Sequence, residues 1–288
     1  MIARTKVGFA VVGLGKIAQG SVLPAFKNSK SAKLVALVGR NRNKTAELAR
    51  RFHAIAIYQS DEYAACLANS DVSAVYIATP PGEHARLTIQ AAEAGKHVLC
   101  EKPLAATVEQ SAAMVEACRQ NGVLLMTAYR KYYEPSTLHL KQLIQSGKLG
   151  RIDAIHTAFS ELYAPGVSQS WLLDSKLAGG GPLMDLGVYC VNTTRWLVDE
   201  NPTQATAQSW TNDTKRFQEV EEGVSFRLQS KRVGGTRQFV VCSGAVVIYI
   251  CSGNEGLGFV GACISIRRST RAHRKNRKAQ LRAEVPTD

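Results

Sequence analysis

The chain has 288 residues, 45% of them apolar and 20% charged, which is an ordinary composition for a globular protein of one large domain or two smaller ones. It contains no apolar run long enough to span a membrane and begins without a charged-then-apolar leader, so we expect a cytoplasmic protein with no membrane partner. Its seven scattered cysteines include no C-x-x-C pair and predict neither disulfides nor a metal site.

Of the net charge of +13, the last 22 residues of the chain alone carry +6. Residues 267–288 hold eight Lys and Arg against two carboxylates, and the rest of the sequence is only mildly basic. Because mild positive charge also suits an anionic cofactor, we expect a disordered basic tail and no nucleic-acid partner. The competing hypothesis, nucleic-acid binding through the tail, predicts a steep salt dependence that disappears when the tail is deleted.

Glycines follow the first predicted strand at the spacing of a dinucleotide site. The apolar run of residues 7–12 leads into Gly13-x-Gly15-x-x-Ala18. In such a turn the first glycine permits a tight bend, the second lets a pyrophosphate approach, and the small third residue keeps the next helix close to the strand. The phosphates would then lie against the first N–H groups of that helix, those of Lys16, Ile17 and Ala18. A purely structural glycine turn is the alternative.

Basic residues follow the second predicted strand. A helix over residues 17–28, broken at Pro24, and a strand over residues 34–38 continue the strand–helix–strand pattern. A site for NAD usually has a carboxylate after this strand, but here the sequence has Arg40 and Arg42. Arginine pairs with phosphate through parallel hydrogen bonds, so we predict NADP as the preferred cofactor, with NAD possible. An exposed basic loop that tolerates both cofactors is the alternative.

Strands and helices continue to alternate up to residue 128. The patterns predict helices over residues 45–52, 61–69, 84–94 and 108–121, and strands over residues 55–58, 72–78, 97–100 and 123–129. Asn43 or Thr45 would cap the first of these helices. Thr79 and Pro80 end a strand where the carboxyl edge of a parallel sheet faces the cofactor. We interpret His84, a lone histidine at a helix start, as structural.

Three motifs together resemble one family of oxidoreductases. They are the glycine turn, the run Ala94-Gly-Lys-His-Val-Leu-Cys-Glu101-Lys102-Pro103-Leu-Ala, and the later run Gly179-Gly-Gly-Pro-Leu-Met-Asp185-Leu-Gly-Val-Tyr189-Cys-Val-Asn192. In this order and spacing they resemble the Gfo/Idh/MocA oxidoreductases, and most of all the glucose-fructose oxidoreductase branch. The resemblance covers about residues 6–228.

The resemblance implies an α/β protein of two domains. Residues 1–128 would form a Rossmann domain with a mostly parallel, doubly wound sheet. Residues 129–266 would form an α+β substrate and oligomerisation domain around an open, mainly antiparallel sheet, with the tail after it. Members of the family pair through such sheets, so a homo-oligomer, a dimer or a tetramer, is expected if this sheet is intact. The implied activity is NAD(P)-dependent hydride transfer at a hydroxyl or carbonyl carbon of a sugar, polyol or cyclic diol.

Lys102, Asp185 and Tyr189 are the predicted catalytic residues. Lys102 ends a buried strand before Pro103, and in the family this bond is commonly cis; Glu101 and Lys102 would also contact the cofactor. Asp185 and Tyr189 are four residues apart on a helix predicted over residues 183–197, and therefore share a face. Tyr189 would act as general acid/base, Lys102 would lower its pKa and polarise the carbonyl, and Asp185 would orient both. A cation about 4 Å away at an effective dielectric of about 20 contributes about 4 kcal/mol, or roughly three pKa units, which would bring the phenol near neutrality.

Arg130, Trp171 and Asn192 are the predicted substrate contacts. Asn192 follows Tyr189 on the same side of the helix. Trp171 would line one side of the site, and packing in the core is the alternative for this residue. Leu172 stands where relatives of this branch often have Arg, which removes a cation. The glycines at 179–181 would let a ligand approach closely.

From about residue 229 the sequence departs from the family pattern, although residues 237–251 and 259–266 remain strand-like. An altered reading frame near codon 230 is one explanation. A sheet that lacks its last strands would expose apolar surface. The main alternative to an active enzyme is therefore a degenerate NADP-binding protein with an impaired C-terminal domain.

Overall fold

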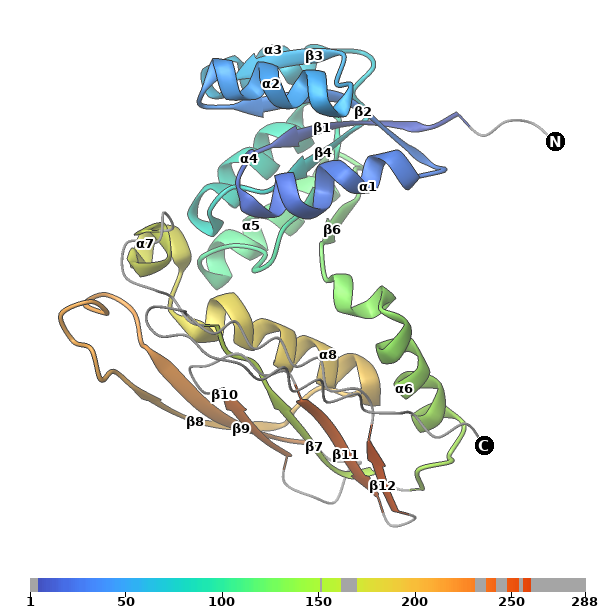
Figure 1. The fold of residues 1–288 in the computed structure, drawn as a ribbon, viewed down its shortest axis with the longest axis vertical. Helices are drawn as coiled ribbons and strands as arrows, with labels where there is room; N and C mark the ends of the chain where they lie inside the picture. The colour runs from blue at the N-terminus through green and yellow to red at the C-terminus, as the bar shows by residue number, and fades with distance from the viewer. Residues whose placement is uncertain are drawn as a thin grey trace, which may run out of the picture.

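Two β-sheets organise the computed structural model, which describes residues 5–150, 152–161, 170–230, 237–241, 248–253 and 256–259. The first sheet has helices on both sides, and the helices over the second sheet lie on the side that faces the first domain (Figure 1). The predicted basic tail, residues 267–288, and residues 260–266 of the last predicted strand lie outside the described residues. No helix within the described ranges is both long and apolar enough to cross a bilayer.

The first sheet is parallel and has the strand order β3-β2-β1-β4-β5-β6. Its strands are β1 (Val7–Val12), β2 (Ala32–Gly39), β3 (Ala56–Gln59), β4 (Ala74–Ile77), β5 (His97–Cys100) and β6 (Leu125–Thr127). The central strands are short apolar runs because helices cover both of their faces. The reversal of strand order beside β1 confirms the predicted doubly wound sheet.

Helices cover the two faces of this sheet separately. The short 3₁₀ turn η2 (Ser60–Glu62) leads into α3 (Tyr63–Ala68), which packs on one face with α4 (Pro81–Glu93) and α5 (Val108–Gln120). On the other face α1 (Leu23–Asn28) and α2 (Arg42–Phe52) pack against β1 and β2. The carboxyl ends of the strands, with the loops that follow them, therefore form one edge at which a ligand can bind.

Several of the expected helix boundaries in this domain are wrong, and α4, for example, begins at Pro81 rather than at residue 84. The helix expected over residues 17–28 is a π-helical turn, η1 (Ala18–Val22), followed by α1, and Pro24 lies in the first turn of α1 rather than at a break. Proline is tolerated there because the first N–H groups of a helix have no intrahelical partner. The helix α2 begins at Arg42 because the side chain of Asn41 accepts from the amide of Lys44, so neither Asn43 nor Thr45 is its cap.

The second sheet is mixed but mainly antiparallel, in the order β12-β11-β7-β10-β9-β8. Its strands are β7 (Ile152–Ala158), β8 (Gln204–Trp210), β9 (Gly223–Gln229), β10 (Arg237–Val241), β11 (Ile248–Gly253) and β12 (Gly256–Phe259). Among the described strands, β7 and β10 form a parallel pair and the other pairs are antiparallel. This arrangement confirms the predicted open, mainly antiparallel sheet.

The helices α6 (Pro135–Gln145) and α8 (Val188–Val198) bury their apolar sides against this sheet (Figure 1). The 3₁₀ turn η3 (Arg130–Tyr133) connects β6 to α6, while η4 (Ser170–Leu173) and α7 (Ser175–Ala178) precede the glycine loop. The helix expected over residues 183–197 again divides into a π-helical turn, η5 (Leu183–Gly187), and α8. Asp185 therefore lies in a wider turn than Tyr189, which is on regular α-helix.

Candidate active site

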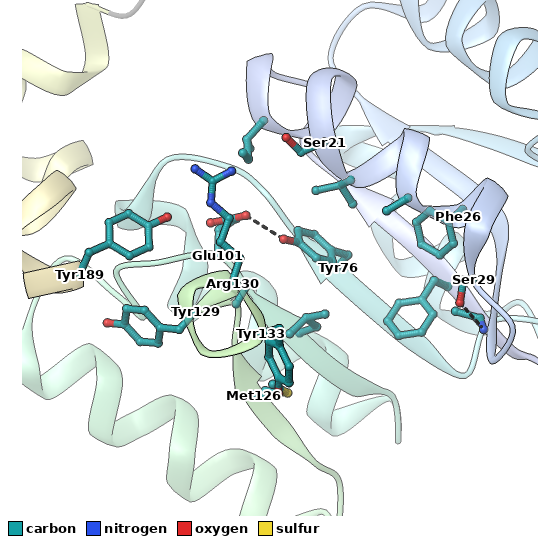
Figure 2. Close-up of a pocket in the computed structure, with 17 residues that line it drawn as sticks. Ser21, Phe26, Ser29, Tyr76, Glu101, Met126, Tyr129, Arg130, Tyr133 and Tyr189 are labelled. Atoms are coloured by element: carbon teal, nitrogen blue, oxygen red, sulfur yellow. Dashed lines mark hydrogen bonds between the residues drawn. The ribbon is translucent and has the colours of Figure 1, made fainter. Parts of the chain in front are cut away.

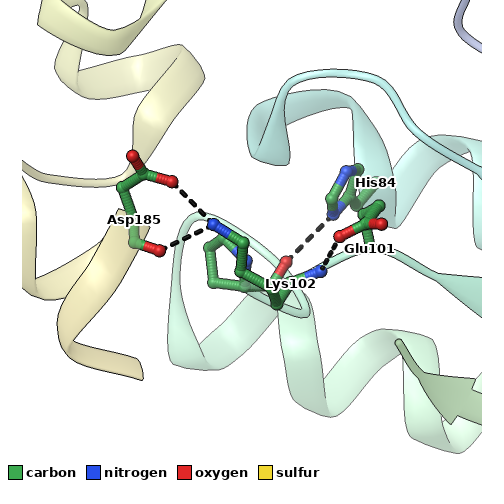
Figure 3. A network of polar contacts seen from close by, with 5 residues as sticks. His84, Glu101, Lys102 and Asp185 are labelled. Carbon is green, nitrogen blue, oxygen red and sulfur yellow. Dashed lines mark hydrogen bonds and ion pairs between the residues drawn. The ribbon is translucent and has the colours of Figure 1, made fainter. Parts of the chain in front are cut away.

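An ion pair joins the two domains at the carboxyl end of β5 (Figure 3). The Nζ atom of Lys102 donates to the Oδ1 atom and to the backbone oxygen of Asp185, both at 2.6 Å. Only 14% of the lysine side chain and 21% of the aspartate side chain are exposed, so solvent screens this pair weakly. The peptide bond between Lys102 and Pro103 is cis, as the resemblance implied.

Tyr189 lies beside this pair. The Nζ atom of Lys102 is 5.1 Å from the centroid of the Tyr189 ring, and the tyrosine is only 7% exposed. Phe159 stacks on the ring with the centroids 5.7 Å apart, and Tyr129 meets it edge-on at 6.2 Å. The predicted phenol, ammonium and carboxylate are therefore brought to one place from two domains.

The pKa of Tyr189 moves in the opposite direction from the one expected. Burial raises its pKa, and this effect outweighs the lowering by the positive charges of Lys102 and Arg130. The expected shift toward neutrality is wrong because spacing along the chain indicates the lysine charge but not the loss of water around the phenol. Tyr189 is therefore protonated across the physiological pH range.

Lys102 keeps its proton as well. Burial acts to lower the pKa of the ammonium, but the negative charge of Asp185 outweighs burial and the pKa is raised. The site at neutral pH thus contains a neutral phenol next to a charged lysine that already has an anionic partner.

A largely apolar cavity of about 370 Å³ adjoins Tyr189 and runs along α1 (Figure 2). Its polar end is formed by Glu101, Arg130 and Tyr189, and Ile17 of the glycine turn lies on its wall. Figure 2 shows the hydroxyl of Tyr189 directed toward the end of the cavity where Glu101 and Arg130 lie. Four predicted site residues therefore share one cavity, and Tyr189 links this cavity to the ion pair.

Hydrogen bonds fix the segment on both sides of Lys102. Upstream, the hydroxyl of Tyr76 donates to Oε1 of Glu101 at 2.7 Å. Downstream, the ring nitrogens of His84 lie within 3.2 Å of the backbone oxygens of Pro103, Leu104 and Thr79. His84 is fully buried, which agrees with its interpretation as a structural residue and explains why burial lowers its pKa despite these bonds.

Apart from Glu101 and Lys102 after β5, the predicted cofactor residues follow three neighbouring strands, β2, β1 and β4. Gly13 has a φ of +89°, and a Cβ atom there would lie 2.6 Å from the oxygen of Ala78, so this turn requires glycine. A Cβ atom on Gly15 would have no described neighbour within 4 Å, which leaves room for a phosphate group at the exposed backbone beside Lys16. The glycine turn thus has space for the pyrophosphate of a dinucleotide, the group that the motif predicts. Ala18, the small residue after the turn, is fully buried.

The other predicted cofactor residues lie on the same sheet edge. Arg40 and Arg42 are exposed after β2, while Thr79 and Pro80 are half-buried after β4. The hydroxyl of Thr79 is buried and has no hydrogen-bond partner among the described residues. The two arginines therefore lie at the carboxyl end of β2, on the same sheet edge as the glycine turn.

Two of the predicted substrate residues do not reach the cavity. The side chain of Asn192 accepts a hydrogen bond from the hydroxyl of Tyr132, and Trp171 lies in η4; neither lines the cavity. The glycine loop also differs from the expectation. A Cβ atom on Gly181 would lie 2.1 Å from the backbone oxygen of Glu221, so this glycine permits a close approach between protein segments rather than by a ligand.

Sequence reasoning missed several aromatic residues around the site. Tyr129 and Tyr133 line the cavity together with Tyr76, and Phe159 packs on Tyr189. The three tyrosines that surround Arg130 in residues 129–133 were a usable signal, because aromatic residues beside a cation are common in binding sites. Nothing in the sequence marks Phe159.

Comparisons with known proteins agree with this architecture. Residues 7–129 match the model of an oxidoreductase family with an NAD-binding Rossmann fold (GFO_IDH_MocA). Residues 137–250 match the model of the GFO/IDH/MocA C-terminal domain, which extends past residue 228, where the sequence motifs placed the end of the resemblance.

Individual relatives act on sugars according to their names. D-xylose 1-dehydrogenase [NADP(+)] of Haloarcula marismortui is 36% identical over 202 residues, which are 68% of this chain and 55% of the relative. Levoglucosan dehydrogenase of Pseudarthrobacter phenanthrenivorans is 34% identical over 59% of this chain and 44% of its own length. The chain thus spans about half the length of the curated relatives it matches.

A solved structure extends the similarity to the whole fold. The aldose-aldose oxidoreductase from Caulobacter crescentus, in complex with glycerol, superposes with a TM-score of 0.81 at 32% identity. The superposition covers 90% of this chain and 79% of that structure.

Proposed function

The chain belongs to the Gfo/Idh/MocA family of oxidoreductases, and from this we propose that it catalyses hydride transfer at a hydroxyl or carbonyl carbon of a sugar, polyol or cyclic diol. Bound NAD(P) would supply or accept the hydride. The observation that carries the proposal is the convergence of Lys102, Asp185 and Tyr189 beside a cavity that also reaches the glycine turn.

Tyr189 is the proposed proton donor in the reducing direction. Its raised pKa keeps the hydroxyl protonated, so the phenol can give a proton to a carbonyl oxygen as that oxygen becomes an alcohol. In the oxidising direction the same group must first lose its proton, which costs more than for an ordinary phenol. At neutral pH the phenol is therefore in the protonated form that reduction uses.

The proposed role of Lys102 is to hold a positive charge beside the reacting oxygen, and that of Asp185 is to keep the lysine in place. The ammonium is held by two hydrogen bonds to Asp185, so its position does not depend on substrate. A fixed positive charge beside the reacting oxygen stabilises the negative charge that develops there. Asp185 orients the lysine and balances its charge in a site with little water.

The proposed cofactor residues are Glu101, Lys102 and those of the three loops described above, and NADP is the proposed preference. Arg40 and Arg42 are exposed and make no ion pair or side-chain hydrogen bond within the part of the chain that the structure describes, so both are available to a 2′-phosphate. That the xylose dehydrogenase relative is named for NADP(+) supports this choice.

The proposed substrate is a sugar or a related polyol. The names of the relatives include a xylose dehydrogenase, a levoglucosan dehydrogenase and an aldose-aldose oxidoreductase. Arg130, at the polar end of the cavity, is the substrate contact that the geometry supports best. Trp171 and Asn192 are weaker candidates because neither lines the cavity.

The second candidate function is binding of NADP without turnover. It is favoured by Leu172, which stands at a position where this branch often has Arg. This function predicts that the protein binds NADP but turns over no sugar or polyol.

One experiment separates the two functions. Purified protein is incubated with NADPH or NADP and a panel of aldoses, ketoses, anhydrosugars and cyclic diols, while the nicotinamide absorbance is followed; binding of NADPH is measured in parallel by its fluorescence. We expect turnover of at least one carbonyl substrate with NADPH. Binding without turnover on the entire panel would instead support the second candidate function.

A further inference from the structure

Tyr76 is a polar residue on the wall of a largely apolar cavity. It lies in β4, half-buried, and its hydroxyl donates to Oε1 of Glu101 at 2.7 Å (Figure 2). The two residues are 25 positions apart in the chain, so this bond is a tertiary contact. A phenol in such a position has to be held by a partner, because an unpaired buried hydroxyl is costly.

The carboxylate of Glu101 connects the hydroxyl of Tyr76 to the backbone of Lys102. While Oε1 accepts from Tyr76, Oε2 accepts from the backbone N–H of Lys102 at 3.1 Å (Figure 3). The backbone N–H of Glu101 donates in turn to the oxygen of Ile77, the residue after Tyr76, at 2.9 Å. Both carboxylate oxygens of Glu101 are therefore hydrogen-bonded, and the backbone of Glu101 is hydrogen-bonded to β4, the strand that contains Tyr76.

We propose that Tyr76 is a positioning residue, whose hydroxyl fixes the Glu101 carboxylate and through it the backbone of Lys102 beside Asp185 and Tyr189. Its catalytic consequence rests on the proposed function, but the positioning itself does not. His84 holds the other side of the same segment through the oxygens of Pro103 and Leu104. The segment that carries the lysine is thus held from β4 on one side and from α4 on the other.

The phenol suits this role because it stays a donor. Burial raises the pKa of Tyr76, and the negative charge of Glu101 raises it further. The hydroxyl of Tyr76 therefore keeps its proton, and can still donate it, at pH values where an exposed tyrosine would begin to ionise. Phenylalanine would keep the ring packing and remove only this donor.

The direct test is amide hydrogen exchange at Lys102 in Tyr76→Phe. Loss of the donor loosens the carboxylate, so we expect the Lys102 amide to exchange about tenfold faster. Tyr63→Phe is the matched control: Tyr63 is also a buried tyrosine, and its hydroxyl donates to the oxygen of Leu87 at 3.1 Å, away from this segment. The control should leave exchange at Lys102 unchanged.

A double variant distinguishes positioning from general packing. In Glu101→Gln the amide cannot accept at both atoms, so adding Tyr76→Phe should produce little further change in exchange at Lys102 or in kcat. On an active wild type, Tyr76→Phe should lower kcat about tenfold while KM for the sugar changes less than about twofold.

Two results would overturn the proposal. One is unchanged exchange at Lys102 in Tyr76→Phe, and the other is full additivity of the Tyr76→Phe and Glu101→Gln effects. If the wild type turns over no sugar, the proposed function fails, but the exchange measurements still decide the role of Tyr76.

Discussion

The two halves of the candidate site are specified in different ways. The half on the first domain consists of short loops after β1, β2, β4 and β5, each placed by a strand of one parallel sheet. The half on the second domain consists of Asp185 on a π-helical turn and Tyr189 on the α-helix after it. The first half depends on local turn chemistry, whereas the second depends on contacts between segments that are distant in sequence.

The contacts of the second half illustrate this dependence. Glu221 accepts from the amides of Gly181 at 2.9 Å and Leu183 at 3.3 Å, across about forty residues. Lys102 holds Asp185 across 83 residues. A nucleotide-binding edge can therefore form on its own sheet, but the catalytic geometry exists only when both domains are folded and in contact.

The largest expected effect comes from breaking the link between the halves. Lys102→Met should lower turnover about a thousandfold, because it removes the fixed positive charge beside the reacting oxygen. It should also lower the free energy of unfolding by about 2 kcal/mol, since Asp185 keeps its charge in a partly buried place after losing the ammonium. Steady-state kinetics and urea denaturation measure the two effects.

The double variant Lys102→Met with Asp185→Asn is the control for this experiment. It also removes the remaining negative charge, so stability should recover while turnover does not. Recovery of both would mean that the pair serves only to join the domains.

Tyr189→Phe tests the second half alone. We expect kcat to fall a hundredfold or more, because the proton donor is lost, while the affinity for NADPH changes less than about threefold. Stopped-flow turnover and fluorescence titration with NADPH give the two values. Unchanged turnover would remove Tyr189 from the mechanism.

Arg40→Ser with Arg42→Ser tests the first half alone. Loss of two charge-assisted contacts to a 2′-phosphate should weaken NADP binding by about thirtyfold to a hundredfold and leave NAD binding nearly unchanged. Arg50→Ser, in the exposed last turn of α2, is the matched control for loss of positive charge. An equal loss of affinity for both cofactors would show that the arginines do not contact the 2′-phosphate.

The pH dependence of turnover tests the assignment of Tyr189 as the general acid/base. Burial raises its pKa above the ordinary value near 10, so the protonated form persists to higher pH than in a free tyrosine. Reduction should therefore be nearly constant between about pH 6 and 9, whereas oxidation, which needs the deprotonated form, should rise up to about tenfold per pH unit. The rise should be absent in the residual activity of Tyr189→Phe, and its persistence there would assign the titration to another group.

The same difference between the halves explains what could be predicted from the sequence. The glycine turn, the parallel strands and the cis bond at Pro103 follow from local patterns or from the resemblance that those patterns carry. The π-helical turn at Asp185 could not be predicted, because i→i+5 and i→i+4 hydrogen bonding require nearly the same local sequence and packing decides between them. The direction of the Tyr189 pKa shift was missed for a related reason, since burial depends on Phe159 and Tyr129, which lie far away in the chain.

The smallest effects are expected from removing a side chain that accepts hydrogen bonds at the start of a helix. One such side chain is taken from each half of the site. Thr107 caps α5 by accepting from the amide of Gln110, three residues away, whereas Glu221 accepts from the amide of Leu183, the first residue of η5, from a distant segment. Thr107→Ala should cost about 1 kcal/mol of unfolding free energy and leave turnover unchanged, because the loss is confined to one helix end. Glu221→Ala should cost a similar amount but also lower kcat severalfold, because η5 carries Asp185. Equal effects of the two variants on kcat at matched loss of stability would contradict the distinction between a locally specified half and one specified by distant contacts.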